Sequence, residues 1–264
     1  MCFDFDSRPP ELPKDLALRR IAGGASAELV TLTSADGTEF SAAFAQAAEG
    51  GDPAVVIVPD VRGLHPFYIE LAERFAQAGH HAIAFDYYGR TAGLGPRDDG
   101  FDYGPHREQA NQHLDQALED LSAAGAELRE RTSTEAVVSL GFCFGGSISF
   151  VAGAHPEVDL AAVIGFYGVL DPARFEGQGV LAQAPNISRP VLGLFGGADQ
   201  AIPGDQIEEL DAALTDAGVE HEIHVYPRAP HSFFDRKQEE FANESEDAWR
   251  RILRFLSGIA ARVA

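Results

Sequence analysis

Cysteine, lysine and long apolar runs are scarce in this chain of 264 residues. The only cysteines are Cys2 and Cys143, which excludes a framework of several disulfides and fits a reducing compartment. No apolar run approaches the ~20 residues of a membrane-spanning helix. The segment Met1–Asp6 is acidic and lacks the basic and then apolar layout of a secretory signal. Together these absences predict a cytoplasmic protein.

Positively charged residues are also few. Lys and Arg number 20 against 41 Asp and Glu, which gives a formal net charge of −21 at pH 7. Proteins that bind nucleic acids or anionic membranes do so through clustered Lys and Arg. We therefore expect no nucleic acid and no membrane as a partner.

What the sequence does contain is typical of an α/β protein. Short apolar segments alternate with segments of helical periodicity, which predicts a mainly parallel central sheet of about eight strands with helices on both faces. No internal repeat or linker divides the chain, so we expect an N-terminal arm over residues 1–25 and a single domain over residues 26–264. The predicted strands are 27–32, 39–45, 54–58, 81–85, 135–140, 160–167, 191–195 and 221–226. The predicted helices are 66–78, 106–131, 144–154, 207–217 and 241–263.

The most informative stretch is Gly141-Phe142-Cys143-Phe144-Gly145-Gly146, between a predicted strand and a predicted helix. It has the Gly-x-nucleophile-x-Gly layout of a nucleophile elbow, with Cys where Ser is usual. The glycines leave room for the strained turn on which such a nucleophile lies. The alternative is a buried cysteine that packs as a small apolar residue in a glycine-rich turn. This stretch alone leaves both interpretations open.

Two polar residues follow later strands, at the sheet edge where parallel sheets bind their ligands. Asp199 follows the strand at 191–195, and His231 follows the strand at 221–226. The chain order Cys143, Asp199, His231 is the order of nucleophile, acid and base in α/β hydrolases. His231 would hold or remove the thiol proton, and Asp199 would orient His231. The start of the predicted helix after Cys143 would stabilise the thiolate. Singly, Asp199 suits a helix cap and His231 a solvated loop, but the joint placement favours a triad.

The other histidines are weaker candidates. His221 and His224 lie within a predicted strand, His113 lies in the middle of a predicted helix, and His155 ends one. No spacing of Cys and His resembles a zinc site. We therefore expect no metal and no cofactor.

Acyl transfer also needs hydrogen-bond donors for an oxyanion. In this fold class one donor is the backbone N–H after the nucleophile, here that of Phe144. The other comes from the loop after strand 54–58, and we assign it to Val61, with Arg62 as the alternative. In the same loop, Asp60 would lie near Cys143; the alternative is a turn residue bonded locally.

With the Cys143 elbow, Asp199 and Pro230-His231-Ser232-Phe233, the chain resembles the dienelactone hydrolase family of α/β hydrolases from about residue 27 onward. The resemblance implies hydrolysis of a small ester or lactone through a thioester acyl-enzyme. Founding members, the carboxymethylenebutenolidases, open dienelactones to maleylacetate in the breakdown of chlorinated aromatics. The resemblance also maps Cys143, Asp199 and His231 onto the family triad. An acidic residue, usually Glu, takes part in thiol activation in this family, and Asp60 holds its position.

The resemblance further implies arginines that bind a substrate carboxylate. One would be Arg90, with Tyr88 beside it as another substrate-binding candidate; the alternative is a surface arginine. The second family arginine would stand at the position of Asp235, and this chain has Arg236 one residue later. A general short-chain carboxylesterase with an unrelated substrate therefore stays open.

Two further hypotheses come from other functional classes. One is a protein of hydrolase fold that binds a small molecule without turnover. The other is a thiol redox sensor, for which no resolving cysteine is evident because Cys2 lies in the arm. The leading expectation is a cofactor-free hydrolase with a small-molecule substrate, as a monomer or small homo-oligomer.

Overall fold

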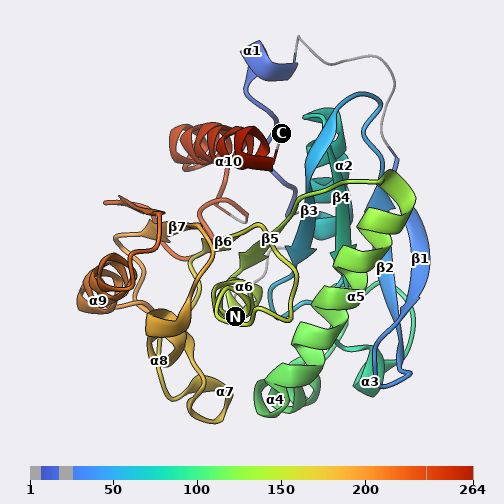
Figure 1. Cartoon of the computed structure of the whole chain (residues 1–264), viewed down its shortest axis with the longest axis horizontal. Helices are drawn as coiled ribbons and strands as arrows, with labels where there is room; N and C mark the ends of the chain where they lie inside the picture. Colours follow the sequence, from blue (N-terminus) through green and yellow to red (C-terminus); the bar gives the residue numbers. More distant parts are fainter. Residues whose placement is uncertain (1–6, 18–25, 236, 264) are drawn as a thin grey trace.

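The computed structural model describes residues 7–17, 26–235 and 237–263. Within these residues, eight strands form one sheet in the order β1-β2-β4-β3-β5-β6-β7-β8 (Figure 1). Strand β2 pairs antiparallel with β1 and β4, and every other pair is parallel. The predicted mainly parallel sheet with covering helices is therefore confirmed.

The strands follow the apolar segments of the sequence. They are β1 (Glu28–Thr33), β2 (Glu39–Ala45), β3 (Gly51–Val58), β4 (His80–Phe85), β5 (Val137–Phe142), β6 (Ala162–Phe166), β7 (Val191–Gly196) and β8 (His221–Tyr226). The longer helices are α2 (Pro66–Gln77), α4 (Gly104–Gln112), α5 (Leu114–Thr132), α6 (Phe144–Ala152), α9 (Gly204–Asp216) and α10 (Ala242–Val263). The short ones are α1 (Lys14–Ala17), α3 (Gly89–Ala92), α7 (Arg174–Gly177), α8 (Val180–Gln183) and the 3-10 helix η1 (Ala184–Asn186).

Helices on both faces bury the central strands, and every residue of β5, β6 and β7 is buried. Helices α2 and α10 share one face, where the ring centroids of Phe75 and Trp249 lie 4.9 Å apart. Helices α5 and α6 cover the opposite face (Figure 1). Because both faces are covered, these strands are continuous apolar runs without alternation. None of the described helices is long and apolar enough to cross a membrane.

One predicted helix is wrong. The expected single helix over 106–131 is two helices, α4 and α5, that meet at His113 with φ −129° and ψ 63°. Helix α4 is mostly polar and buries only Ala110, whereas α5 buries a stripe that includes Leu114, Leu118 and Leu121. The apolar stripe thus begins directly after the junction at His113. His113 is thus a junction and not the middle of a helix.

The described part of the predicted arm is partly buried and contacts helix α10. Pro9, Pro10 and Leu12 are buried. The indole Nε1 of Trp249 in α10 donates a hydrogen bond of 3.1 Å to the carbonyl of Pro10. The remaining parts of the arm, 1–6 and 18–25, lie outside the described residues.

Candidate functional site

Cys143 lies at a strained turn between β5 and α6. Its backbone has φ 52° and ψ −110°, a conformation that an L-residue rarely adopts. The neighbouring glycines are required by close backbone contacts. A Cβ on Gly141 would lie 2.0 Å from the Gly145 carbonyl oxygen, and one on Gly145 would lie 2.2 Å from that of Val58. The turn at Cys143 therefore has the geometry of a nucleophile elbow, and its thiol is half-buried.

His231 and Asp199 come from the loops that follow β8 and β7. Nδ1 of His231 lies 2.6 Å from Oδ2 of Asp199. The other carboxylate oxygen of Asp199 accepts a hydrogen bond of 2.8 Å from the backbone N–H of Ala201. The Asp199 side chain is only 1% exposed, while that of His231 is 23% exposed. The carboxylate is thus held on both sides, and it orients the imidazole.

The thiol of Cys143 is the second partner of His231. Burial disfavours the imidazolium, but hydrogen bonds to Asp199 and Cys143, together with the charge on Cys143, raise the pKa of His231 to about 10. The structure therefore brings Cys143, His231 and Asp199 into one contact chain. Such a chain can hold a proton between the sulfur and the imidazole.

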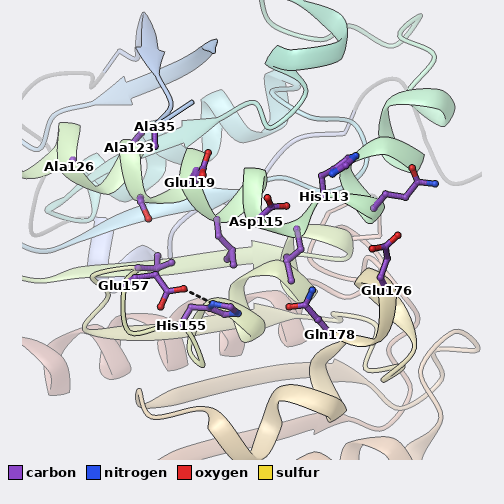
Figure 2. Close-up of a pocket in the computed structure, with 15 residues that line it drawn as sticks. Ala35, His113, Asp115, Glu119, Ala123, Ala126, His155, Glu157, Glu176 and Gln178 are labelled. Atoms are coloured by element: carbon purple, nitrogen blue, oxygen red, sulfur yellow. Dashed lines mark hydrogen bonds and ion pairs between the residues drawn. The ribbon is translucent and has the colours of Figure 1, made fainter. Parts of the chain in front are cut away.

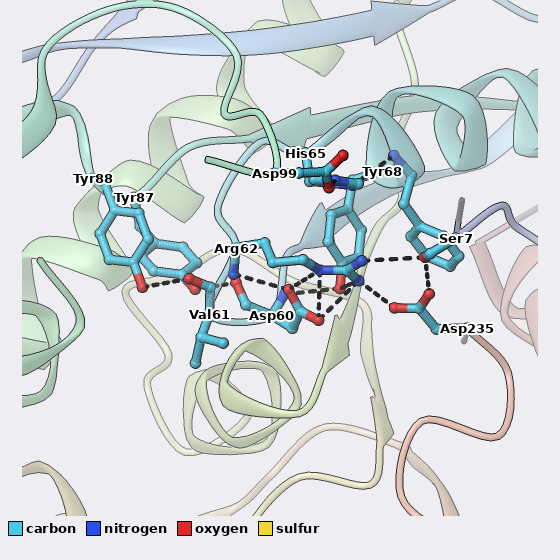
Figure 3. Close-up of polar contacts among 11 residues, drawn as sticks. Ser7, Asp60, Val61, Arg62, His65, Tyr68, Tyr87, Tyr88, Asp99 and Asp235 are labelled. Carbon is cyan, nitrogen blue, oxygen red and sulfur yellow. Dashed lines mark hydrogen bonds and ion pairs between the residues drawn. The ribbon is translucent and has the colours of Figure 1, made fainter. Parts of the chain in front are cut away.

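The loop after β3 carries the second expected oxyanion donor, and two tyrosines hold it. The hydroxyl of Tyr87 donates to the carbonyl of Asp60, and that of Tyr88 donates to the carbonyl of Val61 at 3.0 Å (Figure 3). In a trans peptide, the carbonyl of Asp60 and the N–H of Val61 point to opposite sides. Tyr87 therefore fixes the direction of the Val61 N–H. Tyr88, predicted to bind substrate, is 1% exposed and supports this loop.

The same loop lies beside the start of α6. The close approach of Gly145 to the carbonyls of Val58 and Pro59 sets the end of β3 against the first turn of that helix. Phe144, whose N–H is the first expected donor, opens α6. The two backbone segments that carry the expected donors are thus neighbours.

Asp60 belongs to a buried cluster of three charged side chains. Nε of Arg62 lies 3.0 and 3.1 Å from the two carboxylate oxygens of Asp60, and Nη2 of Arg62 contacts Asp235 (Figure 3). Ser7 contacts both Arg62 and Asp235. Burial opposes the charge of Arg62, but the charges of Asp60 and Asp235 raise its pKa above the ordinary value.

This cluster bears on two predictions. The carboxylate of Asp60, expected beside the thiol, is bound by Arg62, and its role in thiol activation stays a prediction. Arg62, considered above only for its backbone N–H, is a buried ion-pair partner that sequence reasoning missed. The sequence feature that could have indicated this ion pair was the Asp-x-Arg spacing within one loop. Arg236 lies outside the described residues.

Arg90 is placed differently from the expectation. Its guanidinium binds Asp36 at 2.8 Å, Asp120 at 2.6 Å and the hydroxyl of Ser34 at 2.8 Å. Asp120 is fully buried, and burial raises its pKa to about 6 although Arg90 opposes this shift. Because acceptors of the chain itself occupy this guanidinium, the structure does not support a substrate carboxylate at Arg90. The alternative of a surface arginine does not describe it either, because its side chain is only 10% exposed and is held by ion pairs within the chain.

A surface groove lies away from the triad residues. A groove of about 890 Å³ runs along α5 and is lined by residues including His113, Asp115, His155 and Glu157 (Figure 2). His155 is bound to Glu157 at 2.8 Å. Across the described part of the chain, no group of three or more His, Cys, Asp or Glu residues could hold a metal ion. The groove therefore offers no assembled chemistry that compares with the triad.

Known proteins resemble this chain over most of its length. Residues 40–260 match the dienelactone hydrolase family. A candidate carboxymethylenebutenolidase of Yersinia pestis is 33% identical over 213 residues, which cover 77% of each chain. The carboxymethylenebutenolidase of Pseudomonas putida is 29% identical over 215 residues, 78% of this chain and 85% of that one. The crystal structure of a candidate dienelactone hydrolase from Klebsiella pneumoniae has a TM-score of 0.72 at 28% identity and covers 87% of this chain and 99% of its own.

Proposed function

The chain belongs to the dienelactone hydrolase family of α/β hydrolases, and from this premise we propose that it hydrolyses small esters or lactones through a thioester on Cys143. The observation that carries the proposal is the contact chain from Asp199 through His231 to Cys143 at the strained elbow. A base oriented by a carboxylate, beside a nucleophile, is the arrangement that covalent acyl transfer requires.

Acylation begins with the proton of Cys143 on His231. The sulfur attacks the ester carbonyl carbon, and the negative charge that develops on the carbonyl oxygen is bound by the N–H groups of Phe144 and Val61. The tetrahedral intermediate collapses as the bond between carbonyl carbon and leaving oxygen breaks. His231 gives its proton to that oxygen, so the alcohol leaves and a thioester remains. In a lactone, the leaving hydroxyl stays attached to the acyl chain.

Deacylation uses the same groups in the opposite sense. His231, now neutral, takes a proton from water, and the hydroxide attacks the thioester carbonyl. The same N–H pair binds the second oxyanion. The bond between carbon and sulfur breaks, which releases the carboxylic acid and restores the thiolate beside the imidazolium. The cycle needs no cofactor.

The surrounding residues position these groups. Asp199 holds the imidazole with Nδ1 toward itself, which leaves the other ring nitrogen for sulfur and leaving group. Tyr87 orients the peptide that carries the Val61 N–H. Because Arg62 binds the carboxylate of Asp60, the proposal assigns the thiol proton to His231.

The decisive experiment replaces the nucleophile. Cys143→Ala should lower kcat/KM for short-chain p-nitrophenyl esters by roughly 10³-fold or more, since loss of one triad member removes nearly all chemical catalysis. Cys2→Ala is the matched control and should keep full activity. Circular dichroism would establish that both variants fold. An unchanged rate in Cys143→Ala would rule out the thiol mechanism.

A second measurement separates turnover from the competing hypotheses. Rapid quenching during turnover, followed by mass spectrometry, should reveal one acyl group on the peptide that contains Cys143, and it should disappear once substrate is exhausted. A stoichiometric label without product release would instead support a ligand-binding protein. A sulfenic acid with no ester turnover would support a redox sensor.

A further inference from the structure

Tyr167 directly follows β6, the strand between the one that carries the elbow and the one that leads to Asp199. The predicted strand 160–167 ends on this residue, whereas β6 ends at Phe166. Strand β6 pairs in parallel with β5 on one side and with β7 on the other. Because parallel strands bring their carboxyl ends to one edge of a sheet, Tyr167 lies at the edge of the proposed triad.

The peptide unit between Phe166 and Tyr167 is bound on both sides. Its carbonyl accepts a hydrogen bond of 3.0 Å from the backbone N–H of Cys143, and its N–H donates one of 2.8 Å to the carbonyl of Leu194 in β7. The C=O and N–H of a trans peptide point to opposite sides, so one unit spans both neighbours. It therefore fixes the backbone of the proposed nucleophile relative to the strand that precedes Asp199.

The backbone of Tyr167 has an unusual conformation. Its φ is 36°, which a non-glycine residue rarely adopts and which persists only where the surrounding structure enforces it. The next residue meets helix α6, since a Cβ on Gly168 would lie 2.8 Å from the backbone nitrogen of Ser147. Close packing against the first turns of α6 thus holds this turn, and the Tyr167 side chain starts from a fixed point.

The ring of Tyr167 contacts the imidazole of His231. The two ring centroids lie 4.9 Å apart, and the ring planes are inclined by 54°. Tyr167 is 1% exposed. The rings of Phe166, Phe233 and Phe142 also contact it, with centroids at 5.7, 5.8 and 6.1 Å. In a close-packed core these neighbours leave the Tyr167 ring no space to move away from the imidazole.

This contact supplies a constraint that Asp199 does not. The last torsion of a histidine side chain has a broad minimum, so a single hydrogen bond at Nδ1 leaves the imidazole able to swing about that bond. A rigid ring against the imidazole limits this movement. Proton transfer between sulfur and imidazole requires the other ring nitrogen to stay aligned with the sulfur. An aromatic ring also attracts a neighbouring cation, which favours the imidazolium.

We propose that Tyr167 is a positioning residue, whose ring holds the imidazole of His231 in the orientation that proton transfer with Cys143 requires. The inference rests on the proposed function. Tyr167 acts through His231 and needs no contact with substrate. The competing interpretation is a core aromatic residue that packs beneath the site and affects stability alone.

The test is Tyr167→Leu, which removes the ring and keeps an apolar side chain. With ethyl butyrate as substrate, kcat should fall roughly 10- to 100-fold with little change in KM, the effect of a slightly misplaced catalytic group. Ethoxide is a poor leaving group, so the rate depends on the proton that His231 donates. Asp199 and Cys143 raise the pKa of His231 to about 10, and in Tyr167→Leu the alkaline limb of kcat should move down by roughly half a unit to one unit.

Two variants keep the structural effect apart. Tyr167→Phe retains the ring and should keep the alkaline limb of wild type and most of its kcat. Phe75→Leu removes a buried ring that packs on Trp249 at 4.9 Å, and it should lower the melting temperature without moving the limb. Tyr167→Met fills the space of the ring if Tyr167→Leu fails to fold, and the same changes in kcat and limb are expected of it.

The outcomes separate this inference from the proposed function. If wild type does not hydrolyse ethyl butyrate or p-nitrophenyl esters, the proposed function fails. If wild type is active and the folded Leu or Met variant keeps its alkaline limb, Tyr167 only packs, and the inference is overturned while the proposed hydrolysis stands. The inference is also overturned if Tyr167→Phe loses as much kcat as Tyr167→Leu, because the ring would then not be the feature that positions His231.

Discussion

Two groups of polar side chains lie in the loops around Cys143 and differ in their exposure to solvent. One is the triad of Cys143, His231 and Asp199, and the other is the cluster of Asp60, Arg62 and Asp235. Cys143 is half-buried and the His231 side chain is 23% exposed, so the triad is open to solvent on one side. In the neighbouring cluster, the side chains of Arg62 and Asp60 are each 6% exposed and that of Asp235 is 2% exposed. In the first group, the proposed mechanism moves a proton between Cys143 and His231. In the other, the guanidinium is bound by carboxylates on both sides.

The contrast separates the group that is proposed to react from a group of paired charges. Removing charges from water is expensive, and a buried ion pair is maintained only when its partners satisfy one another. Asp60 lies in the loop after β3, and Asp235 lies four residues after His231. Arg62 therefore ties the loop of the proposed oxyanion donor to the loop of the proposed base. The cluster therefore connects two parts of the proposed site, and a role of Asp60 in thiol activation stays a prediction.

The largest effect is expected on the triad side. Asp199→Asn should lower kcat/KM for p-nitrophenyl esters by roughly 10⁴-fold, since an amide cannot hold the imidazole as the carboxylate does. The pH profile sharpens the test. In the native protein the pKa of His231 is raised to about 10, so activity should fall above about pH 10, where the proton for the leaving group is lost. In Asp199→Asn this alkaline limb should move to lower pH.

The same protonation equilibrium affects stability. A pKa that is higher in the folded than in the unfolded protein stabilises the fold fully below the unfolded value, 6.5 for His231, and this contribution is lost as pH rises through about 10. Asp205→Asn, an exposed change in the first turn of α9, is the control for both profiles. An unshifted alkaline limb in Asp199→Asn would show that Asp199 does not act on His231.

For the cluster of Asp60, Arg62 and Asp235, the expected effect is on the stability of the fold. Arg62→Met leaves the carboxylates of Asp60 and Asp235 buried without their cation, which should lower the free energy of unfolding by roughly 3–5 kcal/mol. Urea denaturation measures it. The triple variant Asp60→Asn, Arg62→Met, Asp235→Asn should recover most of this loss because no buried charge remains. A loss below about 1 kcal/mol in Arg62→Met would mean that the cluster is not a structural tie.

The smallest effect is expected at the tyrosine that orients the oxyanion loop. Tyr87→Phe removes the hydrogen bond to the Asp60 carbonyl and should lower kcat by roughly tenfold with little change in KM, a fraction of the loss of a whole oxyanion donor. Tyr226→Phe is the matched control, since its hydroxyl bonds Asp247 on α10 at 2.9 Å. If both variants lower kcat equally, Tyr87 has no special part in the site.

Local pattern in the sequence predicted much of the architecture. The central strands were visible as apolar runs, and the glycines around Cys143 indicated a tight turn, because both depend on nearest neighbours along the chain. The break at His113 was missed because Leu114, Leu118 and Leu121 have a helical spacing and no glycine or proline lies between His106 and Leu121. Whether such a stretch is one helix or two depends on what its polar first half packs against.

The sequence by itself determined the residue types, their order and the strand ends where Cys143, Asp199 and His231 lie. Only the tertiary structure decided which charges pair. Arg62 meets Asp235 from 173 positions away, and Arg90 meets Asp120 from 30 positions away, so neither pair has a local signature. The partner of a guanidinium depends on which carboxylate the fold carries into the same desolvated space.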